Sequence, residues 1–311
     1  MRKTSLFYGL ILCLSILLPV RSYAVSPGAS LDMYVIPGIF GQDYATGWIA
    51  HSHIRFVQYD KAFDPSGHEV DAGVDVTATQ IIEKIGHIQR FGKDDKWQLS
   101  NVLVVPVVNM HAKIKNGPDM SASGLGDLLL ANFLGTWWND HKYHAGLCLG
   151  VSMPMGTYNN DNNLNVGSNR WVLYFPTAVG HFRFPLPKGL FMVDAFIQPE
   201  WRFKNPDNDF KDHDCLEMGA TLTYFPSDDR KLGLFVTPNY QFALNESELN
   251  GKGMGDSDFY SLGGSVGATY NINTKENLSL RWTHNFDGKG NDGGSPSPKI
   301  DAIHFVWSHV F

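Results

Sequence analysis

Hydrophobic residues recur at every second position over much of the second half of the chain. In NLSLRWTHNF, an apolar set that begins at Leu278 and ends at Phe286 alternates with polar residues, and His284 is its only polar member. Successive side chains of a β-strand point to opposite faces, so this alternation predicts a strand with one apolar and one polar face. Five earlier segments show the same pattern, at 145–153, 191–204, 215–224, 231–244 and 260–272.

The links between these segments alternate in length. Tight links are predicted at Asn139-Asp140, Pro187-Lys188, Ser227 to Asp229 and Asn273 to Lys275. Long polar stretches lie near 60–69, 115–124, 156–169, 205–213, 245–257 and 287–298. Outer-membrane barrels have short periplasmic turns and longer external loops. The six long stretches therefore predict an all-β, transmembrane antiparallel β-barrel of about 12 strands, with both termini periplasmic.

The segment TQIIEKIGHIQRF at 79–91 fits two kinds of element. Its isoleucines have a spacing that an amphipathic helix would also show. We favour a strand, because a barrel needs an even number of strands and the neighbouring segment WQLSNVLVVPVVNMHAKI reads as the hairpin partner of this one.

The N-terminus predicts export. Residues 1–24, MRKTSLFYGLILCLSILLPVRSYA, contain two early cations, an apolar run and small residues before a cleavage point, as in a secretory signal peptide. A membrane anchor is the alternative, but the run is shorter than the roughly 20 residues of a spanning helix. Residues 25–48 are interpreted as a periplasmic entry segment or a lumenal plug, and 49–311 as the barrel. We expect the outer membrane of a Gram-negative bacterium.

Composition agrees with a barrel and excludes other classes. Charged residues make up 18% of the chain, aromatic residues 13%, and glycines number 31. The net charge of −6 gives no basic surface for nucleic acid. Beyond the signal segment only Cys148 and Cys215 remain, so at most one disulfide could form.

The polar faces of the strands carry the candidate solute path. In a membrane, charged groups must point inward, and aromatic residues among them indicate an amphipathic path. They form either an ion-pair network that stiffens the barrel or a constriction that selects solutes. The inward candidates are Asp194, Phe196, Glu200, Arg202, Lys204, Glu217, Phe235 and Arg281.

Signals for enzyme or metal chemistry are weak. A G-x-S-x-G pattern at 263–267 lies within an alternating strand, whereas the nucleophile elbow needs a strand, a sharp turn and a helix. A phospholipase would need a serine beside a lipid-facing histidine, and the outward neighbours of His284 are aromatic. The pairs His51/His53 and His141/His144 have no cysteine or carboxylate at ligand spacing. We expect no enzyme activity, no metal and no cofactor.

Residues 123–182 resemble the family of outer-membrane proteins named for the meta-cleavage pathway of phenol degradation. Its pattern is G-x-G-D before a strand, then P-x-G-x-Y, a polar loop and an N-x-W strand with a proline. The chain matches at Gly124, Gly126, Asp127, Pro154, Gly156, Tyr158, Asn169, Trp171 and Pro176, and more loosely at Pro37-Gly38 and Tyr44. The resemblance implies a transporter-type barrel associated with aromatic or hydrophobic compounds. Asp127 either shapes the entry into its strand or contacts solute.

These observations predict a channel for uptake of small solutes, including aromatic or hydrophobic ones, by passive passage through the lumen. The alternative is a closed structural or adhesive barrel that acts through its external loops. Expected partners are outer-membrane lipid, the solute and the barrel-assembly machinery; the oligomeric state is left open. The chain ends HFVWSHVF, and a terminal phenylalanine with alternating apolar residues resembles the signal read during assembly. The signal residues are Ile303, Phe305, Trp307 and Phe311.

Overall fold

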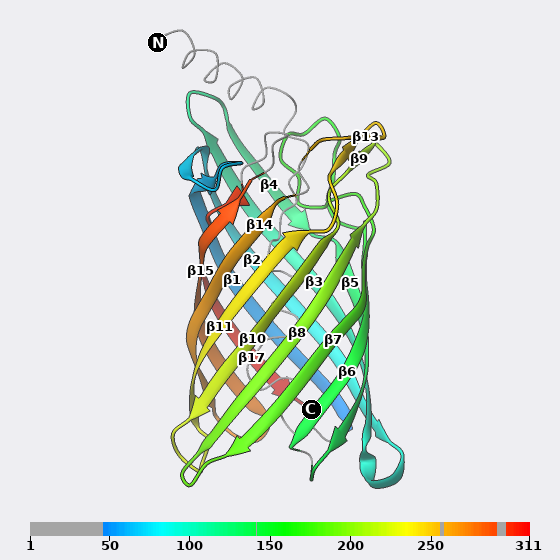
Figure 1. Ribbon diagram of the computed structural model, residues 1–311, viewed down its shortest axis with the longest axis vertical. Helices are drawn as coiled ribbons and strands as arrows, with labels where there is room; N and C mark the ends of the chain where they lie inside the picture. The colour runs from blue at the N-terminus through cyan, green and yellow to red at the C-terminus, as the bar shows by residue number, and fades with distance from the viewer. Residues whose placement is uncertain (1–45, 141, 256–257, 291–296) are drawn as a thin grey trace.

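Antiparallel strands make up almost all of the computed structural model, which describes residues 46–140, 142–255, 258–290 and 297–311. They form one closed, tilted barrel (Figure 1). The predicted signal peptide and nearly all of the predicted entry or plug segment at 25–48 lie outside the described residues. The wall strands are β1 (Gly47–Phe63), β2 (Glu69–Phe91), β3 (Trp97–Ile114), β5 (Leu128–Trp138), β6 (Tyr143–Met153), β7 (Val172–Pro185), β8 (Leu190–Arg202), β10 (Cys215–Phe225), β11 (Leu232–Ala243), β14 (Tyr260–Asn271), β15 (Glu276–Lys289) and β17 (Asp301–Val310).

Twelve strands form this wall, as predicted. β4 (Asp119–Leu125) continues the line of β5 and pairs with the part of β3 nearest the long loops. β16 (Ser297–Pro298) pairs with the last two residues of β1. The short strands β9 (Phe210–Lys211), β12 (Glu248–Leu249) and β13 (Lys252–Gly253) form a separate small sheet in the long loops, and η1 (Lys93–Asp95) lies in a turn. No helix among the described residues is long and apolar enough to cross a membrane.

The barrel closes at β1, which pairs with β17 on one side and β2 on the other. Ile49 lies opposite Val310 in one register and opposite Gly86 in the other. Every wall strand therefore has two neighbours, and closure removes the unpaired edges that an open sheet would expose. The ambiguous segment at 79–91 is a strand, since β2 runs without a break from Glu69 to Phe91.

Side chains alternate between an apolar outer face and a largely polar interior. On β15, Leu278, Leu280 and Trp282 are each 45–50% exposed, whereas Ser279 and Arg281 between them are buried. The four predicted tight links lie at one end of the barrel. At the other end, two predicted long loops are wrong in length: the links at 64–68 and 115–118 are short, because β1, β2, β3 and β4 project beyond the other strands. Cys148 and Cys215 are both buried free thiols, so the possible disulfide does not form.

Candidate functional site in the barrel interior

A group of buried basic side chains lines the interior on four adjacent strands. Arg55 on β1, Lys84 on β2 and Arg281 on β15 are each at most 5% exposed. They surround His304 on β17, whose Nδ1 lies 2.9 Å from Nε2 of His53 and 3.1 Å from Nη2 of Arg281. We call Arg55, Lys84, Arg281, His51, His53 and His304 the basic group. It places positive charge against the interior space of the barrel.

The acidic side chains lie on a different part of the wall, on β8 and β10. Asp194 accepts a hydrogen bond from Nδ1 of His181 at 2.6 Å, and Nε2 of His181 accepts one from Nε of Arg183 at 3.1 Å. Trp137 and His144 stack nearby with ring centroids 4.4 Å apart. Asp194 thus orients a histidine within a packed cluster at the short-turn end. Glu217 is 1% exposed on the neighbouring strand.

A second ion-pair network lies at the long-loop end. Arg202 contacts Glu200 at 2.8 Å and Asp212 at 3.0 Å, and Arg170 reaches the same oxygen of Asp212 at 2.9 Å. Burial opposes ionisation of Asp212, but Arg202, His213 and Arg170 outweigh it and hold the pKa of this carboxyl well below its usual range. The stability that an ionised carboxyl with a lowered pKa contributes is lost only when the pH falls through that lowered pKa. The network around Asp212 therefore stays charged across neutral and mildly acidic pH.

Lys204 was predicted to point inward with these groups, and the structure places it elsewhere. The strand β8 ends at Arg202, so the period-two alternation stops before Lys204. Its Nζ pairs with Asp209 at 2.7 Å, and both side chains are more than half exposed in the long loop.

An apolar strip adjoins the basic group inside the barrel. It runs across β2, β3, β5, β6 and β8 and contains Phe196, one of the predicted path residues. The strip and the basic group meet on β2, where Ile82 and Lys84 are two residues apart and share the inward face. The members of the apolar strip are Ile82, Val104, Leu129, Ala131, Phe133, Cys148 and Phe196.

Phe235 accounts for the G-x-S-x-G pattern. A Cβ at Gly267 would lie 2.5 Å from Cζ of Phe235, so the small residue makes room for an inward ring. Ser265 hydrogen-bonds to Thr283 across the interior face at 2.8 Å. The pattern therefore serves packing within β14, as its alternation predicted, and Phe235 is buried rather than free in the lumen.

Asp127 joins the three parts of the family pattern. It lies between β4 and β5, where its carboxylate accepts hydrogen bonds from the backbone of Gly156 at 3.0 Å and of Ser168 at 2.8 Å, and from Oγ of Ser168 at 2.5 Å. Gly124 has φ +152°, and a side chain there would collide with Thr157. The carboxylate thus anchors the loop at 154–171 to the break in the wall.

Two more residues of the pattern extend this anchor to the next loop. The hydroxyl of Tyr158 accepts a hydrogen bond from Asn205 at 3.2 Å, and Nδ2 of Asn169 donates to Asn205 at 3.1 Å and to Asp207 at 2.9 Å. These hydrogen bonds support the interpretation that Asp127 shapes the entry to its strand. They account for the position of its carboxylate without contact with solute.

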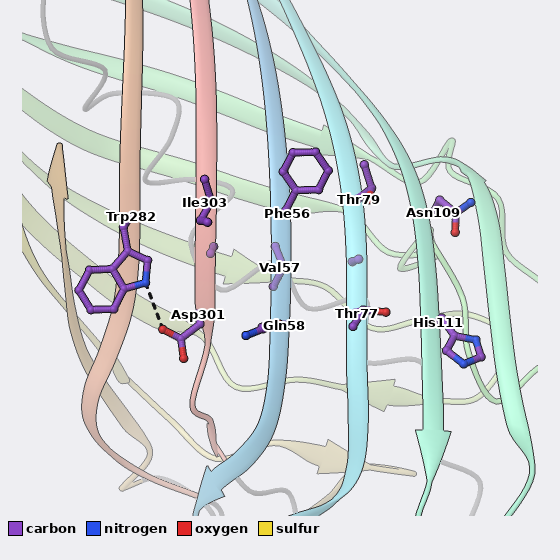
Figure 2. A pocket seen from close by; sticks show the side chains of 12 residues that line it. Phe56, Val57, Gln58, Thr77, Thr79, Asn109, His111, Trp282, Asp301 and Ile303 are labelled. Carbon is purple, nitrogen blue, oxygen red and sulfur yellow. Dashed lines mark hydrogen bonds between the residues drawn. The ribbon is translucent and has the colours of Figure 1, made fainter. Parts of the chain in front are cut away.

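A shallow groove of about 380 Å³ crosses the outer face of β15, β17, β1, β2 and β3. Figure 2 shows Trp282 on one side of the groove, Asn109 and His111 on the other, and Phe56 between them. Nε1 of Trp282 donates to Asp301 at 3.2 Å, and His284, which is outward as predicted, contacts the same carboxylate at 2.8 Å. The groove lies where the apolar outer face passes into a polar one.

Sequence reasoning found part of the interior and missed the rest. It identified Asp194, Phe196, Glu200, Glu217 and Arg281 as inward, and all five are buried there. It missed Arg55 and Lys84, although each lies in an alternating strand. It interpreted His51 and His53 as interfacial or lumenal histidines rather than metal ligands, and both are buried. No group of three metal-binding side chains occurs within the described ranges.

A closed antiparallel barrel with an apolar outer face and a charged interior has the architecture of outer-membrane β-barrel proteins. The chain belongs to the family described as "Putative MetA-pathway of phenol degradation", whose model matches residues 59–295. This confirms the family resemblance of the sequence.

Solved structures agree with this class. The COG4313 outer membrane channel from Pseudomonas putida F1 is 19% identical, with a TM-score of 0.73 over 89% of this chain and 100% of that one. The transport unit of the autotransporter AIDA-I from Escherichia coli is 11% identical, with a TM-score of 0.50 over 94% and 99% of the two chains. At these identities the likeness concerns the fold. No curated protein matches the chain.

Proposed function

We propose that the protein is an outer-membrane channel for small solutes that combine an aromatic or apolar body with a negative charge. The observation that carries the proposal is the junction of the apolar strip with the basic group on the inner wall. An apolar ring can lie against the strip while an anionic substituent lies beside Lys84, Arg55 or Arg281. In addition, neither ring nitrogen of the buried His51 has a hydrogen-bond partner among the described residues.

Passage is passive in this proposal, and no bond is made or broken. The Pseudomonas putida protein is named an outer membrane channel, which supports the same class of activity here. The family description supports a context of aromatic compounds. The alternative, a closed structural or adhesive barrel that acts through its loops, predicts no solute movement at all.

Ion currents through the refolded protein in planar bilayers test the proposal. Three probes separate ring from charge: benzenesulfonate, methanesulfonate and benzyltrimethylammonium. We expect permeability to fall in that order, since only the first has both the ring and the negative charge that the lumen accommodates. The absence of current with all three would favour the closed barrel, and a preference for the cation would contradict the proposed solute class.

We also propose that the C-terminal strand carries the assembly signal. Ile303, Phe305 and Trp307 are 42–49% exposed on the outer face of β17, and Phe311 is 68% exposed at its end. Deletion of Phe311 should reduce the folded protein in the membrane several-fold while leaving the thermal stability of refolded protein unchanged. Quantitative blotting of membrane fractions measures this, with Phe311→Tyr as the control that keeps an aromatic end. Normal membrane levels of the deletion would contradict the role.

A further inference from the structure

Polar side chains interrupt the apolar outer face on four neighbouring strands. Strand alternation points these side chains to the same outer face as Ile85 and Leu103, which are 49% and 37% exposed. The interruption consists of five half-buried side chains. We call them the outer polar patch: Ser52 on β1, Glu83 and His87 on β2, Asn101 on β3 and Asn132 on β5.

The patch is bonded within itself and lies between the two ends of the apolar band. Oγ of Ser52 donates to Glu83 at 2.8 Å, and Nδ2 of Asn132 donates to Asn101 at 2.5 Å. Ser52 is four residues from Trp48 and four from Phe56, whose rings are 54% and 47% exposed. The carboxylate of Glu83 is therefore at a depth where an outer-membrane barrel ordinarily faces hydrocarbon.

Elsewhere, outward polar side chains lie toward the ends of the apolar band, and those of the groove on β1, β2 and β3, such as Thr77 and His111, lie beyond Phe56 toward the long loops. Of the outward positions that the structure describes on β15 and β17, the polar ones are His284 and Asp301 toward the long loops, and His309 and Glu276 at the short-turn end. On β6, β7, β8, β10, β11 and β14 the outward positions are apolar or small. The patch is thus confined to one side of the barrel.

Hydrocarbon cannot hydrogen-bond to a carboxylate or an amide, so such a face is unfavourable against lipid. The patch has a complementary arrangement: Glu83 can only accept hydrogen bonds when ionised, and the amide of Asn132 keeps a second N–H to donate. We propose that this face binds a second copy of the chain, which forms a two-fold dimer. The inference rests on the membrane placement proposed above but not on channel activity.

The barrel geometry fits such a dimer. Two copies inserted in the same direction must be related by an axis along the membrane normal, so residues at equal depth meet. An axis at β3, the strand between β2 and β5, brings Glu83 of one copy against the Asn132 side of the other. Glu83 is four residues above the row of His87 and Asn132, about 10 Å, and the strand tilt visible in Figure 1 raises Asn132 by about 6 Å over two strands. A remaining difference of about 4 Å is within reach of these side chains.

Disulfide trapping in isolated outer membranes tests the dimer. Leu103 lies next to the proposed axis, so Leu103→Cys should link two copies upon oxidation. Leu280→Cys on β15, 50% exposed on another face, is the control. Because Cys148 and Cys215 are buried, wild-type protein reports the background. We expect at least fivefold more dimer from Leu103→Cys than from Leu280→Cys, on non-reducing gels with heat-modifiability as the check on folding.

Substitutions in the Leu103→Cys protein test the polar contacts. Glu83→Ala and Asn132→Ala should each lower the dimer yield at least threefold, whereas Ile81→Ala, at an exposed apolar neighbour of Glu83, should not. Equal yields from Leu103→Cys and Leu280→Cys would indicate random collision and overturn the proposal. Unchanged yields in both alanine variants would also overturn it. Both measurements are independent of whether the protein conducts ions, so failure of the dimer proposal can be distinguished from failure of the proposed channel function.

Discussion

Replacing Arg55 and Arg281 together by glutamine should lower the preference of the channel for anions at least about fivefold. A unit charge 4 Å from a passing ion contributes between about 1 and 4 kcal/mol, from bulk water to a protein-like surrounding. These two guanidinium groups are among the most buried charges of the interior. Reversal potentials across a potassium chloride gradient measure the permeability ratio directly.

The matched control for this result is Lys204→Gln, which removes one positive charge from the exposed loop pair with Asp209. Its effect should be small and should fade at high salt, because exposed charges are screened. A shift as large in the loop variant as in the interior variant would show that selectivity arises at the loops. An unchanged ratio in both would remove the basic group from the solute path.

Asp127→Ala should destabilise the barrel by about 3 kcal/mol, since hydrogen bonds to a charged group contribute roughly 1.5–3 kcal/mol each and this partly exposed carboxylate accepts three. Without it, the loop at 154–171 loses its anchor to the break between β4 and β5. Denaturant unfolding measures the stability, and limited proteolysis measures the exposure of the loop.

Asp161→Ala in the same loop is the control for Asp127. Asp161 is exposed, and the bond described for it uses its backbone N–H, which donates to Asn159 at 3.0 Å. The variant should therefore unfold like the wild type. If Asp127 only shapes the wall, single-channel conductance of folded Asp127→Asn protein should match that of the wild type. A large change in solute selectivity with normal stability would instead assign Asp127 to the solute path.

The fold was predictable because period-two alternation and loop length depend on local sequence. Leu278 to Phe286 predicted β15 directly, and the outward His284 followed from the same count. The failures have physical causes too. Polar stretches near 60–69 and 115–124 read as loops, but strands that project beyond the apolar band need no apolar face, so they alternate less clearly.

The interior was only partly predictable because its contacts join distant residues. His53 and His304 lie 251 positions apart in sequence and touch only because the barrel closes. Likewise, the family pattern around Asp127 marked the right residues, but its meaning depended on the loop that folds back from Gly156 to Ser168. Alternation predicts which face a side chain occupies; it does not predict which strand brings its partner.

The pairing of β1 with β17 sets an order on folding. The contact between Ile49 and Val310 cannot form until β17 has been made. The logarithmic term for closing a loop of about 260 residues is about 5 kcal/mol of chain entropy, which is about 2 kcal/mol more than for a loop of about 30 residues. The hairpin of β1 with β2 can form early, but the free edge of β1 must wait for β17. Pairing of β17 with β1 is therefore the step that closes the barrel. Folding should be slow because this contact joins residues that are far apart in sequence.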